Sequence, residues 1–358
     1  MTGLNFDAVF VGLATAILSS LIIVITKKHH ISLSSDSFEG VQKFHSAPTP
    51  RIGGLPLIFG ILAAGFYLEA DAFRILAWTG IAALPAFVLG LTEDIFEKGG
   101  VKARFIATLV SGVIFFFVTG YSVERVEVSW LDFFLANSVF SVAFTAFAIG
   151  SATNSVNIID GFHGLASGTV LIILGSIGMV SWQVGDLVLL QIVLVIFSVT
   201  LGFFLINFPF GKLFLGDGGA YLLGFLVSAL SVMLSVRNPE VSPWICPLIL
   251  SYPLTELVVS ISRKIRRDGH HPAMPDGVHL HMLVHGVIVK SKLLGRKPEA
   301  VQHAVTSLTL WSLPLLSLLL ASVSELAGFF VIRSTIIIFC AYLALYSLIH
   351  IYNHRNKT

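Results

Sequence analysis

The sequence predicts an all-α fold, that of a polytopic membrane protein with about eleven transmembrane helices. Of its 358 residues, 55% are hydrophobic and 12% are charged, whereas soluble domains carry about twice that charged fraction. The mean hydropathy is +0.89. Apolar runs of roughly 17–25 residues, the length that a membrane-spanning helix requires, recur along the whole chain. Together these observations exclude an ordinary soluble domain.

The predicted helices follow one another across short polar gaps and form a single domain over residues 1–358. No basic region precedes the first run and no small-residue cleavage site follows it, so we expect a retained helix. Pro56 in the second run, and Pro247 and Pro253 in the ninth, weaken those two predictions, although membrane helices tolerate proline where neighbours satisfy the freed carbonyl. The predicted spans centre on residues 8–26, 53–69, 74–91, 104–120, 132–150, 164–182, 186–206, 218–236, 242–261, 306–324 and 327–350.

The polar motifs lie in alternate gaps between these spans, and alternate gaps of a polytopic protein lie on the same side of the membrane. Eighteen of the 22 Lys and Arg residues fall in those gaps or in the C-terminal tail, and such positive charge marks the cytoplasmic side. We therefore predict a cytoplasmic active site, a periplasmic N-terminus and a large basic cytoplasmic loop over residues 262–303. Chemistry on one face indicates an enzyme, because a secondary transporter, the main alternative, would place charged groups near the midplane.

Asn154, Asn157 and Asp160 are spaced by three residues, which places them on one face of a helical turn. Amides and a carboxylate in this arrangement can bind a heterocycle or a ribose, or help to hold a metal-bound phosphate. Helix capping is the simpler interpretation, because Asn and Asp are common at helix ends. Both interpretations remain open from these residues alone.

Two further acidic sites indicate chemistry on anions. Asp217 lies between glycines in Phe214-Leu215-Gly216-Asp217-Gly218-Gly219, at a predicted helix N-terminus that favours phosphate, and Mg²⁺ is typically shared between carboxylates and substrate phosphates. Glu93 and Asp94 are adjacent acids at the end of another predicted helix, which suits a general base or a shared metal site. The alternatives are an Asp N-cap for the first site and a solvated pair for the second.

The basic loop carries the histidines, as His270-His271 and His279-Leu280-His281. Their spacing lacks the closed ligand set of a zinc site, and imidazoles amid basic charge fit diphosphate binding better. A polybasic segment attracted to anionic lipid is the alternative. In the first motif-bearing gap, Lys43 and Arg51 are candidate phosphate contacts.

Taken together, these motifs resemble the polyprenyl-phosphate N-acetylhexosamine-1-phosphate transferase superfamily (glycosyltransferase family 4) over nearly the whole chain. The most specific matches are Asn154-x-x-Asn157-x-x-Asp160-Gly161, Phe214-Leu215-Gly216-Asp217-Gly218 and His279-Leu280-His281, and the stretch from His45 to Gly54 resembles the first loop of the WecA and TagO type. Three positions depart from the family pattern and argue for a WecA/TagO-like rather than a MraY-like protein. Glu93 occupies the position of a usual Asp, His163 that of a frequent second Asp, and Met282 that of a further His in several relatives.

The resemblance implies transfer of a sugar 1-phosphate from a UDP-N-acetylhexosamine to undecaprenyl phosphate, with release of UMP. Such a step initiates O-antigen, lipopolysaccharide or other cell-envelope polysaccharide synthesis. The implied cofactor is Mg²⁺, with Mn²⁺ as the alternative. The implied partners are the two substrates and membrane lipids, with no nucleic acid and with a homodimer as an option, in a bacterial inner membrane.

The resemblance also assigns roles to single residues. Asp217 would be the main metal ligand, and Asp94, with Glu93 and Asp160, would be catalytic, Asp94 acting on the lipid phosphate as base or positioning group. The nucleotide pocket would comprise Asn154, Asn157, Asp160 and Phe214, the last stacking on uracil. The phosphate and sugar contacts would be Lys43, Arg51, His163, His279 and His281. An inactive regulatory family member is a further alternative, because of Glu93 and His163.

Overall fold

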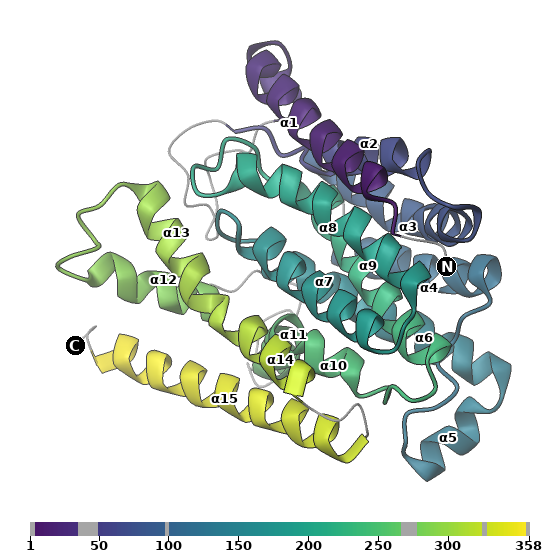
Figure 1. Ribbon diagram of the computed structural model, residues 1–358. Coiled ribbons are helices and arrows are strands. Elements are labelled where there is room, and N and C mark those ends of the chain that lie inside the picture. Colours follow the sequence, from purple (N-terminus) through teal and green to yellow (C-terminus); the bar gives the residue numbers. More distant parts are fainter. Residues whose placement is uncertain (1–3, 35–48, 97–99, 266–277, 324–327, 356–358) are drawn as a thin grey trace.

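The computed structural model describes residues 4–34, 49–96, 100–265, 278–323 and 328–355. Within these ranges the chain forms helices and no β-strand (Figure 1), so the predicted all-α class is confirmed. In chain order the helices are α1 (Phe6–Ser34), α2 (Gly54–Gly65), α3 (Ala70–Phe96), α4 (Val101–Thr119), α5 (Ser129–Leu135), α6 (Ser138–Ile158), α7 (Leu165–Gln183), α8 (Leu187–Asn207), α9 (Gly216–Arg237), α10 (Ile245–Ile249), α11 (Ser251–Ile265), α12 (Leu280–Lys290), α13 (Glu299–Leu310), α14 (Ser312–Val323) and α15 (Gly328–Arg355).

Among the described residues, nine helical segments are long and apolar enough to cross a membrane, with α13 and α14 counted together, against the eleven spans predicted. Two predicted spans account for the difference. The span at 53–69 becomes α2, whose 12 residues rise only about 18 Å against a hydrocarbon core of about 30 Å. The span at 242–261 is divided at Leu250 into α10 and α11, where Pro253 cannot donate a hydrogen bond to the carbonyl four residues before it.

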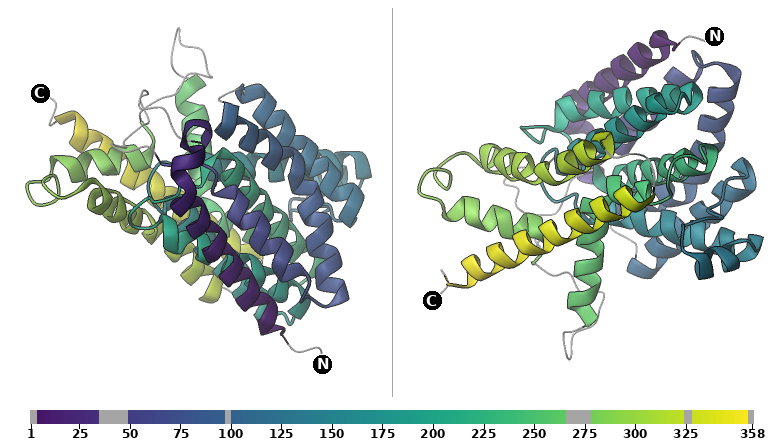
Figure 2. Two further views of the ribbon diagram at one scale, coloured as in Figure 1. Left: turned by 90° about the horizontal axis from the view of Figure 1, so that it is seen from above. Right: turned by 60° about the horizontal axis from the view of Figure 1, so that its bottom comes forward.

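The segment predicted as a large loop, residues 262–303, contains the end of α11, all of α12 and the start of α13. The basic side chains Lys290, Lys292, Arg296 and Lys297 are exposed, whereas Arg263 and Lys264 at the end of α11 are half-buried. Helix α11 projects beyond the neighbouring helices in both views of Figure 2. The histidine pair His270-His271 lies outside the described residues.

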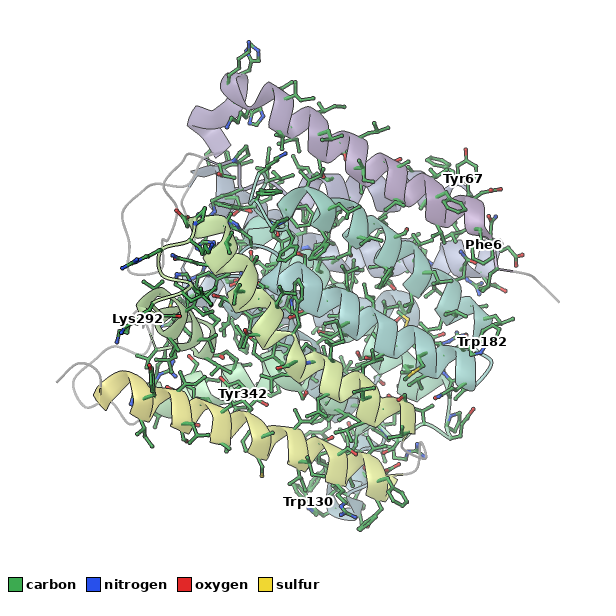
Figure 3. All side chains as sticks on the ribbon, turned by 60° about the vertical axis from the view of Figure 1, so that its left-hand side comes forward. Phe6, Tyr67, Trp130, Trp182, Lys292 and Tyr342 are labelled. Atoms are coloured by element: carbon green, nitrogen blue, oxygen red, sulfur yellow. The ribbon has the colours of Figure 1, made fainter. Side chains whose placement is uncertain are left out.

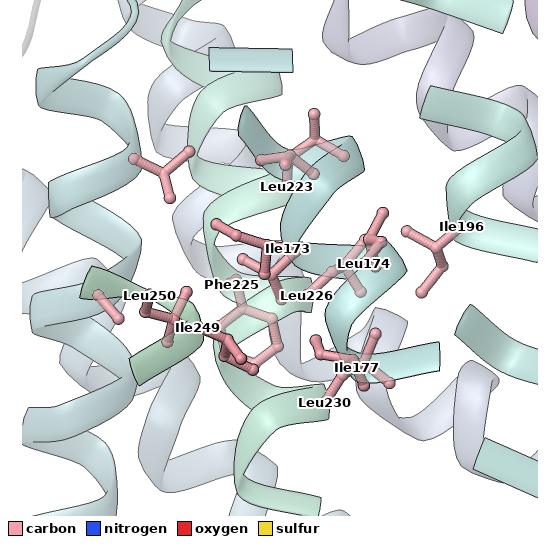
Figure 4. Close-up of a cluster of buried hydrophobic side chains, with 14 of the residues drawn as sticks. Ile173, Leu174, Ile177, Ile196, Leu223, Phe225, Leu226, Leu230, Ile249 and Leu250 are labelled. Atoms are coloured by element: carbon pink, nitrogen blue, oxygen red, sulfur yellow. The ribbon is translucent and has the colours of Figure 1, made fainter. Parts of the chain in front are cut away.

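Helix α9 forms the centre of the bundle. Almost every residue along it is buried, and it packs against α2, α3, α6, α7, α8 and α10. Figure 4 shows part of this core, where Leu223, Phe225 and Leu226 of α9 meet Ile173 and Leu174 of α7. Neighbouring helices, and not lipid, therefore cover α9 along most of its length. Because α9 is fixed in this way, the residues at its N-terminus are held by the whole bundle.

The two ends of the bundle differ in chemistry. Phe6, Tyr67 and Trp182 lie at one end and Lys292 lies at the other (Figure 3). Exposed Tyr and Trp side chains at bundle ends are typical of the membrane–water interface, and Tyr67 and Trp182 are both exposed. The end marked by Lys292 is the end at which the polar motifs converge.

Helices α3 and α9 approach closely where the acidic motifs meet. A Cβ atom at Gly90 of α3 would lie 2.7 Å from the backbone of Asp217 and Gly218, so only glycine permits this distance. Gly216, the first residue of α9, has φ +73°, a left-handed conformation that favours glycine. A Cβ atom there would clash with the Arg51 carbonyl and the Asp94 carboxylate.

Gly216→Ala is therefore expected to destabilise the protein strongly. Gly185→Ala is the matched control, because Gly185 has φ +75° with nothing within 4 Å of the added Cβ. The control should cost only the left-handed backbone, about 1–2 kcal/mol. We expect the midpoint of thermal unfolding in detergent to fall distinctly further for Gly216→Ala than for Gly185→Ala. Equal midpoints would contradict the close packing around Gly216.

Candidate functional site

A cavity of about 760 Å³ opens where the ends of α3 and α6 meet the starts of α4, α9 and α12, with α11 along one side. Nearly all of the described residues predicted to form the site line it. They are Arg51, Glu93, Asn154, Asn157, Asp160, His163, Phe214, Asp217, His279 and His281. Asp94 lies behind the wall, and Lys43 lies outside the described residues. Motifs as far apart in the sequence as Arg51 and His281 thus share one cavity.

Asp217 lies in the first turn of α9 and faces the last turn of α6. Its Oδ1 accepts a hydrogen bond of 2.8 Å from Asn157 Nδ2. Asn154, one turn earlier, instead donates to Thr108 Oγ1 at 2.8 Å and to the Gly150 carbonyl at 2.7 Å. The residues of the predicted polar face therefore make different contacts. Asn157 orients Asp217, and Asn154 connects α6 to α4 at the cavity wall. Their predicted contacts with nucleotide stay predictions.

Glu93 and Asp94 are neighbours in sequence but face different surroundings. The Asp94 side chain is 1% exposed. Its Oδ1 accepts from the Asp217 backbone N–H and its Oδ2 from the Gly218 N–H, both at 2.8 Å. These are two of the N–H groups that the start of a helix leaves without an intrahelical partner, so Asp94 caps α9 from another helix. This geometry favours a structural contribution, and the predicted catalytic role of Asp94 stays a prediction.

Glu93 lines the cavity and is paired with Arg104, whose Nη1 lies 2.9 Å from Glu93 Oε1 and 3.6 Å from Asp217 Oδ2. Glu93 Oε2 is buried without a hydrogen-bond partner among the described residues. Arg104 belongs to the first turn of α4. From the sequence it was included only in the count of Lys and Arg residues and was not predicted as a site residue. Its position shortly after the acidic pair, at the start of the next helix, is the signal that would have identified it.

Asp160 follows α6 and takes part in the electrostatics of the same cavity. Burial raises the pKa of its carboxyl group to about 7, and the negative charge of Asp217 adds to this effect. Arg51 opposes it. Burial alone disfavours a charged carboxylate, and a second carboxylate nearby disfavours it further. The cavity thus concentrates acidic groups that a bound cation would stabilise.

The first loop and the Phe214 motif run side by side. The Phe214 N–H donates to the Pro50 carbonyl at 2.9 Å, and the Gly53 N–H donates to the Phe214 carbonyl at 3.0 Å. These bonds bring Arg51 to the cavity, where its Nη2 lies 3.6 Å from Asp94 Oδ1. The first motif-bearing gap is therefore paired with one of the most specific motifs.

His163, which departs from the family pattern, packs against Phe214, with the two rings 5.7 Å apart and tilted by 31°. Its Nδ1 lies 2.9 Å from the Pro209 carbonyl, to which an Nδ1–H can donate. Asn207 steadies the same region by accepting from the Gly164 N–H and donating to the Leu213 carbonyl, both at 2.7 Å. His163 thus supports the Phe214 ring from one side, and its predicted contact with sugar or phosphate stays a prediction.

His279 and His281 both reach the cavity at the start of α12. Their rings are stacked, 5.3 Å apart and 3° from parallel. His279 Nδ1 lies 2.8 Å from an oxygen of the buried Glu256 on α11, a residue that sequence reasoning did not identify. Burial lowers the pKa of His281 to about 4, so this imidazole is neutral at pH 7 and acts as a hydrogen-bonding group rather than a cation.

A model of the family described as glycosyl transferase family 4 matches residues 76–235. A Bacillus subtilis protein named probable undecaprenyl-phosphate N-acetylglucosaminyl 1-phosphate transferase is 30% identical over 287 residues, which cover 76% of each chain. The chain belongs to glycosyl transferase family 4.

Other members of the family match over similar lengths. The undecaprenyl-phosphate alpha-N-acetylglucosaminyl 1-phosphate transferase of Yersinia pestis is 24% identical over 74% of this chain and 73% of its own. The phospho-N-acetylmuramoyl-pentapeptide-transferase of Oceanobacillus iheyensis is 27% identical over 66% of this chain and 77% of its own. The resemblance inferred from the motifs is thereby confirmed at the level of the superfamily.

The two neighbouring acids should respond differently to the loss of charge. In Asp94→Asn, the amide NH₂ would face a backbone N–H of α9, so one buried donor loses its acceptor, at a cost of about 1–3 kcal/mol. Glu93→Gln keeps an acceptor for Arg104 at a partly exposed site, and we expect a change within about 1 kcal/mol. Thermal unfolding of both variants in detergent checks this, and an equal loss of stability in both would contradict the capping role of Asp94.

Proposed function

We propose that the protein transfers an N-acetylhexosamine 1-phosphate from a UDP-linked donor to a polyprenyl phosphate, undecaprenyl phosphate in bacteria, and releases UMP. The observation that carries the proposal is a single cavity in which a charged centre adjoins an apolar wall. Arg51, Arg104 and Asp217 belong to the centre, and the wall is formed by Val101, Phe105, Phe147, Ile261 and Ile265. A charged nucleotide sugar and a lipid phosphate need such a pair of surfaces side by side. The Bacillus subtilis and Yersinia pestis relatives are named as undecaprenyl-phosphate N-acetylglucosaminyl 1-phosphate transferases, which supports the proposed acceptor and transferred group.

The carboxylates of the charged centre fit a divalent cation. Glu93 and Asp217 both lie within 3.6 Å of the same Arg104 nitrogen, and Glu93 Oε2 is buried without a hydrogen-bond partner in the described part of the chain. No group of three or more His, Cys, Asp or Glu side chains in that part could hold a metal by itself. Mg²⁺ commonly takes one or two carboxylates and completes its coordination with substrate phosphates. We therefore propose Mg²⁺ held by Asp217 and Glu93, and Mn²⁺ could occupy the same place.

The reaction forms a bond between an oxygen of the lipid phosphate and the β-phosphorus of the donor, and it breaks the bond from that phosphorus to the oxygen of UMP. When bound, the cation offsets the charge of the diphosphate during this transfer. Arg51 and Arg104 supply further positive charge at the cavity wall, and Asn157 keeps the Asp217 carboxylate oriented through its hydrogen bond.

A strong general base is unnecessary for this reaction. The second pKa of a phosphate monoester is about 6, so the lipid phosphate is mostly a dianion at pH 7 and attacks without losing a proton. Positioning and electrostatic stabilisation then account for most of the catalysis. This agrees with an Asp94 whose two oxygens are occupied by backbone N–H groups of α9.

UMP release from a panel of donors tests the proposed activity. Purified protein is given undecaprenyl phosphate, Mg²⁺ and, in turn, UDP-N-acetylglucosamine and its epimers. We expect UMP release with at least one donor, and none when the acceptor is omitted or the cation is chelated. If no donor gives UMP while a family member is active in the same detergent, the chain is an inactive member or has another function.

Asp217→Asn should abolish the Mg²⁺-dependent release of UMP. Loss of a metal carboxylate removes several kcal/mol of transition-state stabilisation, which corresponds to a decrease of at least about 100-fold in kcat. Asp71→Asn is the matched control, because Asp71 belongs to the first turn of α3 and its side chain is 72% exposed. The control should keep wild-type activity, and both variants should elute as folded protein. Normal turnover of Asp217→Asn would contradict the metal assignment.

A further inference from the structure

One buried acid outside every motif lies directly behind the histidines of the cavity. Glu256 belongs to the middle of α11 and is 0% exposed. Burying a carboxylate is costly unless hydrogen bonds or an opposite charge stabilise it. Glu256 meets this condition through three different donors, and each of them connects it to the start of α12 or to α15.

The first two donors belong to the histidine motif itself. His279 Nδ1 lies 2.8 Å from Glu256 Oε1, so the hydrogen bond requires the proton on Nδ1. The backbone N–H of Leu280 points at the same carboxylate, 3.3 Å from each oxygen. One side chain therefore fixes both the ring of His279 and the first peptide of α12. The stacked ring of His281, 5.3 Å away, is held in turn.

The third donor comes from the last helix. The Tyr342 hydroxyl of α15 donates to Glu256 Oε2 at 2.5 Å, and Figure 3 shows Tyr342 on the side of α15 that faces the bundle. One turn further along α15, the Tyr346 hydroxyl donates to the Val278 carbonyl at 3.1 Å. The His279 segment is thus connected to α11 and α15 by polar contacts. The residues that make them, Glu256, Tyr342 and Tyr346, do not themselves line the cavity.

We propose that Glu256 is a positioning residue that acts through His279. Its carboxylate accepts the Nδ1–H and holds the ring so that, with a proton on both nitrogens, the Nε2–H can donate to the diphosphate of the nucleotide-sugar donor. The proposal rests on the proposed transferase function. A carboxylate bound to one nitrogen of a histidine determines what the other nitrogen can do, and the loss of such a supporting partner in metal and catalytic sites costs about 10–100-fold. Because Glu256 does not line the cavity, it acts on the donor through the residues that it holds, and His279 is the one that its side chain contacts directly.

A double-mutant cycle on UMP release tests this relation. Glu256→Gln keeps the shape but removes the charge, and we expect kcat/KM for the donor to fall about 10–100-fold. Most of the loss should be a higher KM for the UDP-sugar, with the KM for undecaprenyl phosphate unchanged. A variant that merely folded less well would lower kcat alone. In a His279→Ala background, Glu256→Gln should have no further effect.

Two tyrosine variants complete the experiment. Tyr342→Phe removes one of the bonds to Glu256 and should give a smaller rise in donor KM, again absent in the His279→Ala background. It also keeps the test possible if Glu256→Gln does not fold. Tyr252→Phe is the control, because Tyr252 is equally buried on α11 and its hydroxyl makes no hydrogen bond within the described residues. It should behave as wild type.

A second readout is independent of turnover. UDP should raise the thermal midpoint of the wild type and of Tyr252→Phe, and should raise that of Glu256→Gln less. Losses that add up across the cycle, an unchanged donor KM in Glu256→Gln, or an equal UDP shift in that variant would overturn the positioning role. If the wild type itself releases no UMP, the proposed function has failed instead, so the two failures are distinguishable.

Discussion

Two hydrogen bonds from the start of α9 to the Asp94 carboxylate connect the parts of this molecule that matter for its chemistry. The N–H groups of Asp217 and Gly218 each donate at 2.8 Å, and Gly90 and Gly216 permit the close approach that these bonds require. Because α9 is surrounded by other helices, its first turn cannot move to find another partner. The Asp217 side chain is therefore held toward the cavity by the core of the bundle itself.

Several other side chains of the cavity are positioned around Asp217. Asn157 and Arg104 both approach Asp217, and Arg104 brings Glu93 beside it. On the opposite wall, Glu256 holds the histidines at the start of α12. The site is thus built from buried polar contacts between helices, each of which fixes a side chain that reaches the cavity. Such preorganisation is what phosphoryl transfer requires, since positioning and electrostatics do most of the work.

The fold class and the grouping of the motifs could be predicted from the sequence, because hydropathy and loop alternation are local patterns. Which of the two acids Glu93 and Asp94 faces the cavity could not be predicted from the sequence. Successive residues on a helix point about 100° apart, and which one faces the cavity depends on the packing of α3 against α9. Glu256 was missed for a related reason: it is the single acid of α11, in a stretch that was predicted as part of a membrane span, and its partners lie 23 and 86 positions away. Two predicted spans failed: α2 ends at Gly65 and is too short to cross the membrane, and a break before Pro253 divides the other into α10 and α11.

The most direct test of this account is the anomalous signal of Mn²⁺ in crystals of the protein grown with Mn²⁺ and UDP. We expect one peak in the cavity within coordinating distance of the Asp217 carboxylate, with Glu93 turned to the ion and Asp94 still accepting from the backbone N–H groups of α9. A peak coordinated by Asp94, or Asp94 released from α9 when the ion binds, would contradict it.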